Sequence, residues 1–313
     1  MNERKQRAKR IRAIGGAALA SPRWWPTWIG LGVLWLIAQT PWRTQRALGR
    51  GIGRMLHACA PGRRRITAIN VSICFPDWSD ADRRRLVRRN FEELGISLFE
   101  MASAWWAPAR RLRDLGPLTG REHLEAALAR GKGVIVLQGH FLTTDLGGQR
   151  LGMEIPFTAT YAEPKNPVMR HLTTRLRGRF IERQLHHSHV RDIVRELKAN
   201  RVVWHGPDQS PPRRSGVETR FFDYPVLSSV STAKLARASG AAVLPYLPVR
   251  GRDGRYEFRL EAPLEDFPGD DMTAATQRIN DVIERHIREA PEQYLWAHKR
   301  FKRAVAGAAD PYA

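Results

Sequence analysis

Hydrophobic positions recur with helical spacing in the stretch between Ala81 and Trp106. Its apolar side chains are separated by alternating steps of four and three residues: Val87, Phe91, Leu94, Leu98 and Met101. This spacing places them along one face of a helix, where they can pack against a core. The preceding residues 79–82, Ser-Asp-Ala-Asp, are typical of a helix start. We therefore predict a long, core-facing helix from Ala81 toward Trp106.

Shorter apolar runs alternate with helical patterns along the rest of the chain. We predict strands at residues 134–138, 157–161, 202–205, 242–249 and 256–261. Helices are expected at residues 123–130, 167–180, 189–199, 231–239 and 273–289, and a loose tail at 305–313. Strands that alternate with helices indicate an α/β fold, with a mainly parallel central sheet flanked by helices.

The stretch from Trp24 to Trp42 carries no charge and contains five tryptophans, clustered toward its two ends. Tryptophan at both ends of an apolar segment is typical of membrane interfaces, and about 20 apolar residues cross a bilayer. We therefore predict an N-terminal membrane anchor helix, which either spans the bilayer or lies in its surface. A buried core helix is the alternative. No good signal-peptide cleavage site follows.

The anchor is flanked by basic residues on both sides, so its orientation stays open. The first 23 residues hold seven Lys and Arg and one acid, Glu3. Residues 43–65 are basic with spaced apolar positions, which suggests a helix along a membrane surface.

Composition limits the class of protein. The 313 residues are 42% hydrophobic, enough for one large domain or two small ones. The net charge of +21 implies a polyanionic partner: nucleic acid, an anionic membrane surface or a phosphorylated substrate. Cys59 and Cys74 lie in no Cys/His cluster, so we expect both to be reduced and expect no structural zinc site. We also expect no cofactor.

One segment combines a predicted strand with candidate chemistry. The run Val134–Leu137 delivers His140 at its C-terminal end, where α/β folds usually place reactive groups. Asp145 follows five residues later, about 140° around a straight helix, so the two side chains meet only across a turn or a helix start. Such a pair suits a base held in one tautomer by a carboxylate. A loop histidine and a helix-capping aspartate are the alternative, and spacing alone does not decide.

Five segments, in order, are similar to one known family. They are residues 22–36, 70–76, 139–148, 202–208 and 290–302, and together they cover nearly the whole chain. The chain thereby resembles the late acyltransferases of lipid A biosynthesis, within the lysophospholipid-acyltransferase superfamily. The resemblance implies a glycerol-phosphate-acyltransferase-like fold. It divides the chain into a basic segment (1–23), the anchor (24–42), an acyltransferase domain (43–303) and a tail (304–313).

The resemblance also implies an activity and its partners. A fatty acyl group would move from acyl carrier protein to a hydroxyl of an acyl chain on a phosphorylated lipid A precursor. This would take place in the bacterial inner membrane, with the catalytic domain at its cytoplasmic face. No covalent acyl-enzyme is required. Acylation of another glycolipid or of a lysophospholipid is the nearest alternative.

Carried over by position, His140 would be the general base and Asp145 its orienting acid, while Arg177 and Asp208 match family residues implicated in activity. Two departures stand out. Lipid A members commonly have glutamate where this chain has Asp145, and the tract at 209–212 reads Gln-Ser-Pro-Pro instead of carrying a second acid and a glycine turn. An internal Arg177–Asp208 ion pair is the alternative reading of those two residues.

The remaining chemistry concerns charge. A thioester oxyanion needs donors, which we expect from backbone N–H groups at 139–141 or from Arg177. The excess of arginine would hold the precursor's phosphates, with Lys299 and Arg300 as candidates, and would steer the acidic carrier protein. A basic helix face against lipid headgroups is the alternative for Lys299 and Arg300.

Two alternative functions do not involve acyl transfer to a lipid. A membrane-tethered polyanion or nucleic-acid binder would use the +21 charge, but the basic residues are scattered and no nucleic-acid-binding motif is evident, so we expect no nucleic-acid partner. A catalytically inactive scaffold is made conceivable by the two departures, and an intact His140 argues against it.

Overall fold

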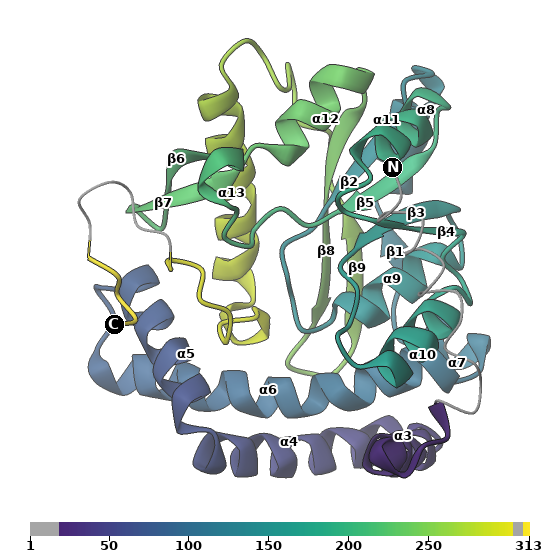
Figure 1. The fold of residues 1–313 in the computed structure, drawn as a ribbon, viewed down its shortest axis with the longest axis vertical. Coiled ribbons are helices and arrows are strands. Elements are labelled where there is room, and N and C mark those ends of the chain that lie inside the picture. Colours follow the sequence, from purple (N-terminus) through teal and green to yellow (C-terminus); the bar gives the residue numbers. More distant parts are fainter. Residues whose placement is uncertain (1–18, 303–308) are drawn as a thin grey trace.

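A central sheet of seven strands organises the chain (Figure 1), and the computed structural model describes residues 19–302 and 309–313. The strand order is β1-β9-β8-β2-β5-β3-β4. Neighbours pair in parallel except β8 and β9, which are antiparallel. The strands are β1 (Leu118–Thr119), β2 (Val134–Leu137), β3 (Phe157–Tyr161), β4 (Arg183–His186), β5 (Val202–His205), β8 (Ala242–Arg250) and β9 (Tyr256–Leu260). The predicted α/β fold with a mainly parallel sheet is confirmed.

Helices cover both faces of this sheet, as expected where parallel strands are buried on both sides. They are α3 (Trp25–Ala38), α4 (Trp42–Cys59), α5 (Pro61–Cys74), α6 (Asp80–Trp106), α7 (Ala109–Arg113), α8 (Arg121–Ala129), α9 (Thr144–Gly152), α10 (Pro167–Arg177), α11 (Val190–Lys198), α12 (Ser231–Ser239) and α13 (Met272–Glu289). Short 3₁₀ turns occupy Pro22–Trp24, Arg213–Ser215 and Pro291–Gln293. A separate antiparallel hairpin, which the sequence did not predict, consists of β6 (Gly216–Phe221) and β7 (Tyr224–Ser229).

Strand β2 shows how the sequence pattern produces two cores. All four of its side chains are buried, and they alternate between the faces of the sheet. Ile135 and Leu137 join a cluster that also contains side chains of α11, α12 and α13, while Val134 and Val136 join one with side chains of α8 and α9. An uninterrupted apolar run is therefore what this central strand requires.

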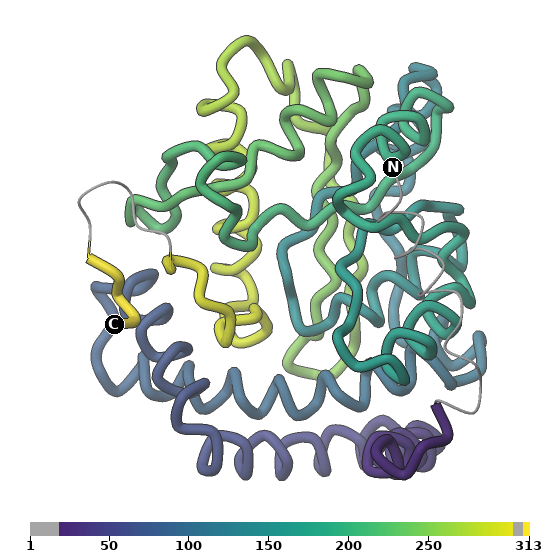
Figure 2. The backbone as a smooth tube through the Cα atoms, in the orientation of Figure 1, coloured from purple at the N-terminus to yellow at the C-terminus, as the bar shows by residue number. Residues whose placement is uncertain are grey.

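The predicted long helix is confirmed as α6, which begins at Asp80 and runs to Trp106. Ser79 caps it by accepting a hydrogen bond from the Asp82 N–H at 3.1 Å. Helix α4 lies alongside α6 (Figure 2), and the two approach until their backbones touch. A Cβ on Gly95 would lie 2.0 Å from the Gly49 carbonyl oxygen, and one on Gly53 would lie 2.2 Å from that of Phe91. Glycine is therefore required where these helices cross.

The N-terminal prediction needs correction. Helix α3 has 14 residues, or about 21 Å of helix, which falls short of the roughly 30 Å core of a bilayer. It ends at Ala38, because Pro41 cannot continue it. Across residues 19–302 and 309–313, no helix has both the length and the apolar character needed to cross a membrane. This finding contradicts the predicted placement in a bacterial inner membrane, and the spanning anchor is unsupported. Most of the basic 1–23 segment lies outside the described residues.

The end of the chain is also better ordered than predicted. Tyr312 is buried, its hydroxyl donates to Asn70 Oδ1, and it accepts a hydrogen bond from the Phe301 N–H at 3.1 Å. The predicted loose tail is therefore wrong at this residue, while its residues 305–308 lie outside the described ones.

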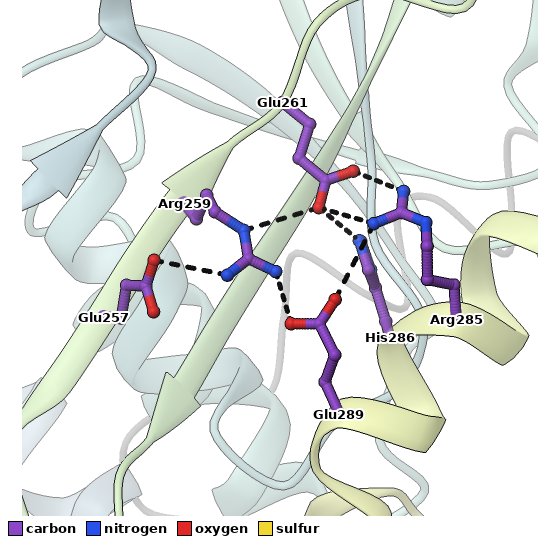
Figure 3. Close-up of polar contacts among 6 residues, drawn as sticks. All are labelled: Glu257, Arg259, Glu261, Arg285, His286 and Glu289. Atoms are coloured by element: carbon purple, nitrogen blue, oxygen red, sulfur yellow. Dashed lines mark hydrogen bonds and ion pairs between the residues drawn. The ribbon is translucent and has the colours of Figure 1, made fainter.

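An ionic cluster joins β9 to α13 (Figure 3). Glu261 sits at its centre and accepts hydrogen bonds from Arg285 at 2.5 and 3.0 Å and from His286 at 2.9 Å. Burial alone would raise the pKa of Glu261, but these bonds hold it well below its usual range. Arg259 and Glu289 extend the cluster through a contact of 2.5 Å. The cluster thus fixes α13 against the sheet.

The crossing of α4 and α6 can be tested with Gly95→Ala. The added methyl group would overlap a backbone carbonyl, so we expect a loss of about 3 kcal/mol in the free energy of unfolding, measured by urea denaturation. Gly51→Ala is the matched control, because Gly51 lies on α4 and a Cβ added there would meet nothing within 4 Å, so alanine should raise stability by up to about 1 kcal/mol. Equal stability of the two variants would contradict the backbone contact.

Candidate functional site

Two loops meet where adjacent parallel strands end. The register of β2 and β5 places Leu137 beside His205, so the segments that follow these strands leave the sheet together. The first segment carries His140 and the second carries Asp208. Parallel strand pairing therefore brings together two residues that are 68 positions apart in the chain.

His140 and Asp208 form a tight pair. His140 Nδ1 lies in a short hydrogen bond with Asp208 Oδ1, and the His140 backbone N–H donates to Asp208 Oδ2 at 2.8 Å. The side chain of Asp208 is 1% exposed, whereas that of His140 is 35% exposed. The carboxylate thus holds the ring from the protein interior and leaves Nε2 as the nitrogen available to a bound molecule.

The charges in this pair stabilise each other. Burial lowers the pKa of His140, but the charge of Asp208 and its hydrogen bond outweigh burial and raise that pKa above the ordinary value. Burial would raise the pKa of Asp208, yet His140 and Tyr294 hold it far below its usual range. Asp208 is therefore ionised at neutral pH.

Tyr294 is a site residue that was not predicted from the sequence. Its hydroxyl donates to Asp208 Oδ2 at 2.8 Å. Its segment also pairs with the histidine loop, because Leu295 N–H donates to the His140 carbonyl at 3.0 Å and Leu142 N–H donates to the Gln293 carbonyl at 2.7 Å. The available signal was the similarity of residues 290–302 to the family, which did not single out this hydroxyl.

Two buried asparagines hold that segment in place. Asn90 on α6 donates to the carbonyls of Glu292 and Tyr294 at 2.9 and 2.7 Å. Asn70 on α5 donates to the carbonyls of Trp296 and His298 at 2.6 and 2.8 Å. Helices α5 and α6 therefore support the His140 loop indirectly, through segment 292–298, and Asn70 gives a physical reason for the family-like segment 70–76.

The predicted pairing of His140 with Asp145 does not occur in the described residues. Asp145 lies in the first turn of α9 and binds Arg177 of α10 instead, with Nε–Oδ1 and Nη2–Oδ2 distances of 2.7 and 3.0 Å. The charge of Asp145 raises the pKa of Arg177. Asp145 at the start of α9 therefore faces α10, while the imidazole of His140 faces the loop after β5. The alternative Arg177–Asp208 ion pair is therefore also absent from these residues.

The predicted oxyanion donors are partly occupied. The backbone N–H groups of His140 and Phe141 already donate to Asp208 and to the Gly139 carbonyl, both at 2.8 Å. Arg177 uses Nε and Nη2 on Asp145, and its Nη1 makes no hydrogen bond among the described residues. Its side chain is 30% exposed. Arg177 therefore keeps a donor nitrogen that the described residues do not occupy, whereas the N–H groups of His140 and Phe141 are both occupied.

Lys299 and Arg300 have different surroundings. Arg300 is buried, where it donates to the Leu227 carbonyl at 3.0 Å and to Ser228 Oγ at 2.7 Å, so it supports β7 and leaves no accessible guanidinium for a phosphate. Lys299 is exposed, with Nζ 5.2 Å from the Tyr312 ring centroid. The segment is not helical after Gln293, so the alternative of a basic helix face does not apply.

Two further histidines stand close to the pair. Burial, followed by the charge of His140, lowers the pKa of His205 to about 4, and burial followed by Lys302 lowers that of His298 to about 4. Both are therefore neutral at pH 7.

Within residues 19–302 and 309–313, no group of three or more His, Cys, Asp or Glu is arranged to hold a metal ion. An imidazole that is held by a buried carboxylate, as His140 is by Asp208, can take a proton from a hydroxyl group.

The pairing can be tested by NMR titration of the imidazole of His140, assigned by comparison with His140→Gln. In Asp208→Asn the pKa of His140 should fall below its ordinary value, because burial then acts without the opposing carboxylate. Asp145→Asn is the control and should leave that pKa unchanged. A pKa of His140 that falls in Asp145→Asn and stays unchanged in Asp208→Asn would instead identify Asp145 as the partner of His140.

Comparison with known proteins identifies the family of this chain. A sequence profile of the bacterial lipid A biosynthesis acyltransferases matches residues 14–303. The chain is 36% identical to the lipid A biosynthesis lauroyltransferase of Escherichia coli over 297 residues, which cover 94% of this chain and 97% of the relative. It is 37% identical to the palmitoleoyltransferase of the same organism over 93% and 95% of the two chains, and 25% identical to the myristoyltransferase over 93% and 91%. The chain therefore belongs to the family of bacterial lipid A biosynthesis acyltransferases.

Proposed function

We propose that this enzyme transfers a fatty acyl group from the thioester of acyl carrier protein to a hydroxyl of an acyl chain on a phosphorylated lipid A precursor. Residues 43–303 would form the acyltransferase unit. The observation that carries the proposal is the His140–Asp208 pair, in which Nε2 of the imidazole stays available to a bound molecule. The chain that contains this pair belongs to a family of lipid A acyltransferases. The relatives named for lauroyl, palmitoleoyl and myristoyl transfer support a fatty acyl donor.

His140 acts as the general base in this proposal. The acceptor alcohol is a poor nucleophile until it loses its proton, which passes to Nε2 as the oxygen attacks the thioester carbonyl. Asp208 fixes the tautomer and stabilises the imidazolium that forms. A new C–O bond replaces the C–S bond, and the proton on His140 leaves with the thiol of the carrier. Asp208 thus takes the orienting role that the sequence had given to Asp145.

Arg177 stabilises the negative charge that develops on the thioester oxygen. The two hydrogen bonds from Arg177 to Asp145 fix the plane of its guanidinium, and Nη1 remains available. A positioned cation is suited to an oxyanion because it needs little reorganisation during the reaction. Asp145 is then a positioning residue, and an aspartate or a glutamate at this position can serve that purpose.

The reaction itself can be tested by mass spectrometry of a tetra-acylated lipid A precursor incubated with a panel of acyl carrier protein thioesters. The wild type should add the mass of one acyl group, and His140→Ala should lose this activity by at least about a hundredfold, since a general base contributes that much. Circular dichroism and thermal melting of the variant provide the folding control. Absence of a product with every donor, despite folded wild-type protein, would refute the proposed function.

The rate should depend on pH through His140. This residue must be neutral to act, and Asp208 raises its pKa above the ordinary value, so kcat/KM should rise with pH through that raised pKa and be lost below it. Tyr294→Phe should move this acid limb to higher pH. Asp208, without the hydroxyl donor, becomes a stronger acceptor for the proton of His140. An unmoved limb with unchanged kcat would exclude a role for the hydroxyl.

The role of Arg177 can be separated from that of Asp145. Arg177→Ala should lower kcat by about a hundredfold, in line with the loss of one oxyanion donor, with the KM for the donor changed little. Asp145→Glu keeps the carboxylate and should retain most of the activity, whereas Asp145→Asn should lower kcat. Unchanged turnover in Arg177→Ala would leave the pair a purely structural contact.

A further inference from the structure

Helices α4 and α6 border two adjoining surface cavities of about 420 and 410 Å³, and arginine is the most frequent lining residue in both. The first is formed by Arg54, His57, Arg85, Arg88, Arg89 and Glu92. The second shares Arg54, Arg89 and Glu92 with the first. It adds four arginines, Arg46, Arg50, Arg250 and Arg252, and two acidic residues, Glu93 and Glu292. We call these two cavities together the arginine groove. Neither His140 nor Asp208 lines it, and the mechanism above does not use it.

The positive charge of the arginine groove is only partly compensated. Arg54 pairs with Glu92 at 2.7 Å, and the buried Arg250 at one end pairs with Glu93 and Glu100. Four exposed arginines have no carboxylate partner among the described residues: Arg50, Arg88, Arg89 and Arg252. Burial and the charges of Arg64 and Arg88 lower the pKa of His57. So many like charges repel one another, and an anionic partner would relieve that repulsion.

The shape of the groove favours an extended partner over a single anion. From Arg46 to His57 the lining follows α4 for 11 residues, or about 16 Å. One or two guanidinium groups are enough to hold a phosphate. The first cavity has no apolar lining side chain other than the stems of its arginines, so it offers nothing to an acyl chain. A row of carboxylates along a helix matches both its length and its charge.

The groove also reaches the catalytic loop. Gln293 and Glu292 line the second cavity. The Gln293 carbonyl accepts a hydrogen bond from the Leu142 N–H at 2.7 Å, and its side chain bonds to the Arg250 backbone at 2.7 and 2.9 Å. A partner seated in the groove would therefore stand beside the segment that holds His140, within range of a thioester carried on a long flexible arm.

We propose that the arginine groove is the docking surface for an acidic helix of the acyl carrier protein that delivers the thioester. This inference rests on the proposed function and adds to it the place where the donor binds. Exposed charges of this kind act mainly on the association rate and on its salt dependence. Docking therefore affects the carrier-bound donor and leaves a carrier-free thioester unaffected.

The test compares two donors with the same acyl group: lauroyl-acyl carrier protein, and lauroyl-pantetheine, which has no protein and no charge. The variant is Arg50→Glu with Arg89→Glu, two exposed groove arginines outside the catalytic site. We expect kcat/KM for the carrier-bound donor to fall by about thirtyfold and to lose much of its decline with added salt. Turnover of the pantetheine thioester should stay at the wild-type level.

A matched control carries the same change of charge elsewhere. Arg191→Glu with Lys198→Glu alters two exposed residues of α11 that form no ion pair among the described residues, and it should leave both donors unaffected. An equal loss with both donors in the groove variant would overturn the proposal and assign the groove to the acceptor's phosphates or to a lipid surface. Unchanged use of the carrier-bound donor would overturn it as well. Wild-type turnover of the pantetheine thioester shows separately that the proposed reaction takes place.

Discussion

The site depends on keeping one carboxylate ionised inside the protein. A buried charge without partners is costly, and Asp208 meets that requirement by accepting hydrogen bonds from the ring and backbone of His140 and from Tyr294. These donors come from different parts of the chain. The loop after β2, the loop after β5 and the C-terminal segment must therefore adopt one arrangement together. Asn70 and Asn90 extend the same requirement to α5 and α6.

Local patterns in the sequence were sufficient for most of the fold. Buried strands such as Val202–His205 and the long helix α6 follow from apolar periodicity and from a capping serine, which act over a few neighbouring residues. Strand β4 was missed because its Arg183–His186 run lies at the edge of the sheet and carries no apolar pattern. The hairpin β6–β7 was missed although alternate residues are buried, because the buried side chains include the polar Thr219 and Ser228, which accept hydrogen bonds from Asn280 of α13.

The site was harder to predict than the fold. Strand pairing decides which loops meet, and the sequence does not show that the strand before His140 lies beside the one before Asp208. The short spacing between His140 and Asp145 therefore suggested a pair that the start of α9 prevents. Resemblance to the family singled out His140, Asp145, Arg177 and Asp208, but it did not predict that His140 pairs with Asp208 and Asp145 with Arg177. Tyr294 could not be recognised, because its role depends on a contact across 86 positions.

The pairing of Tyr294 with the loop of His140 has a consequence for biosynthesis. The histidine emerges from the ribosome roughly 150 residues before the segment that completes its surroundings. Contacts so distant in sequence form late, since a large loop must close before they contribute. A nascent chain with its sheet already folded would still hold a buried carboxylate that lacks one of its donors. The surroundings of His140 are therefore completed only after every strand of the central sheet has been synthesised.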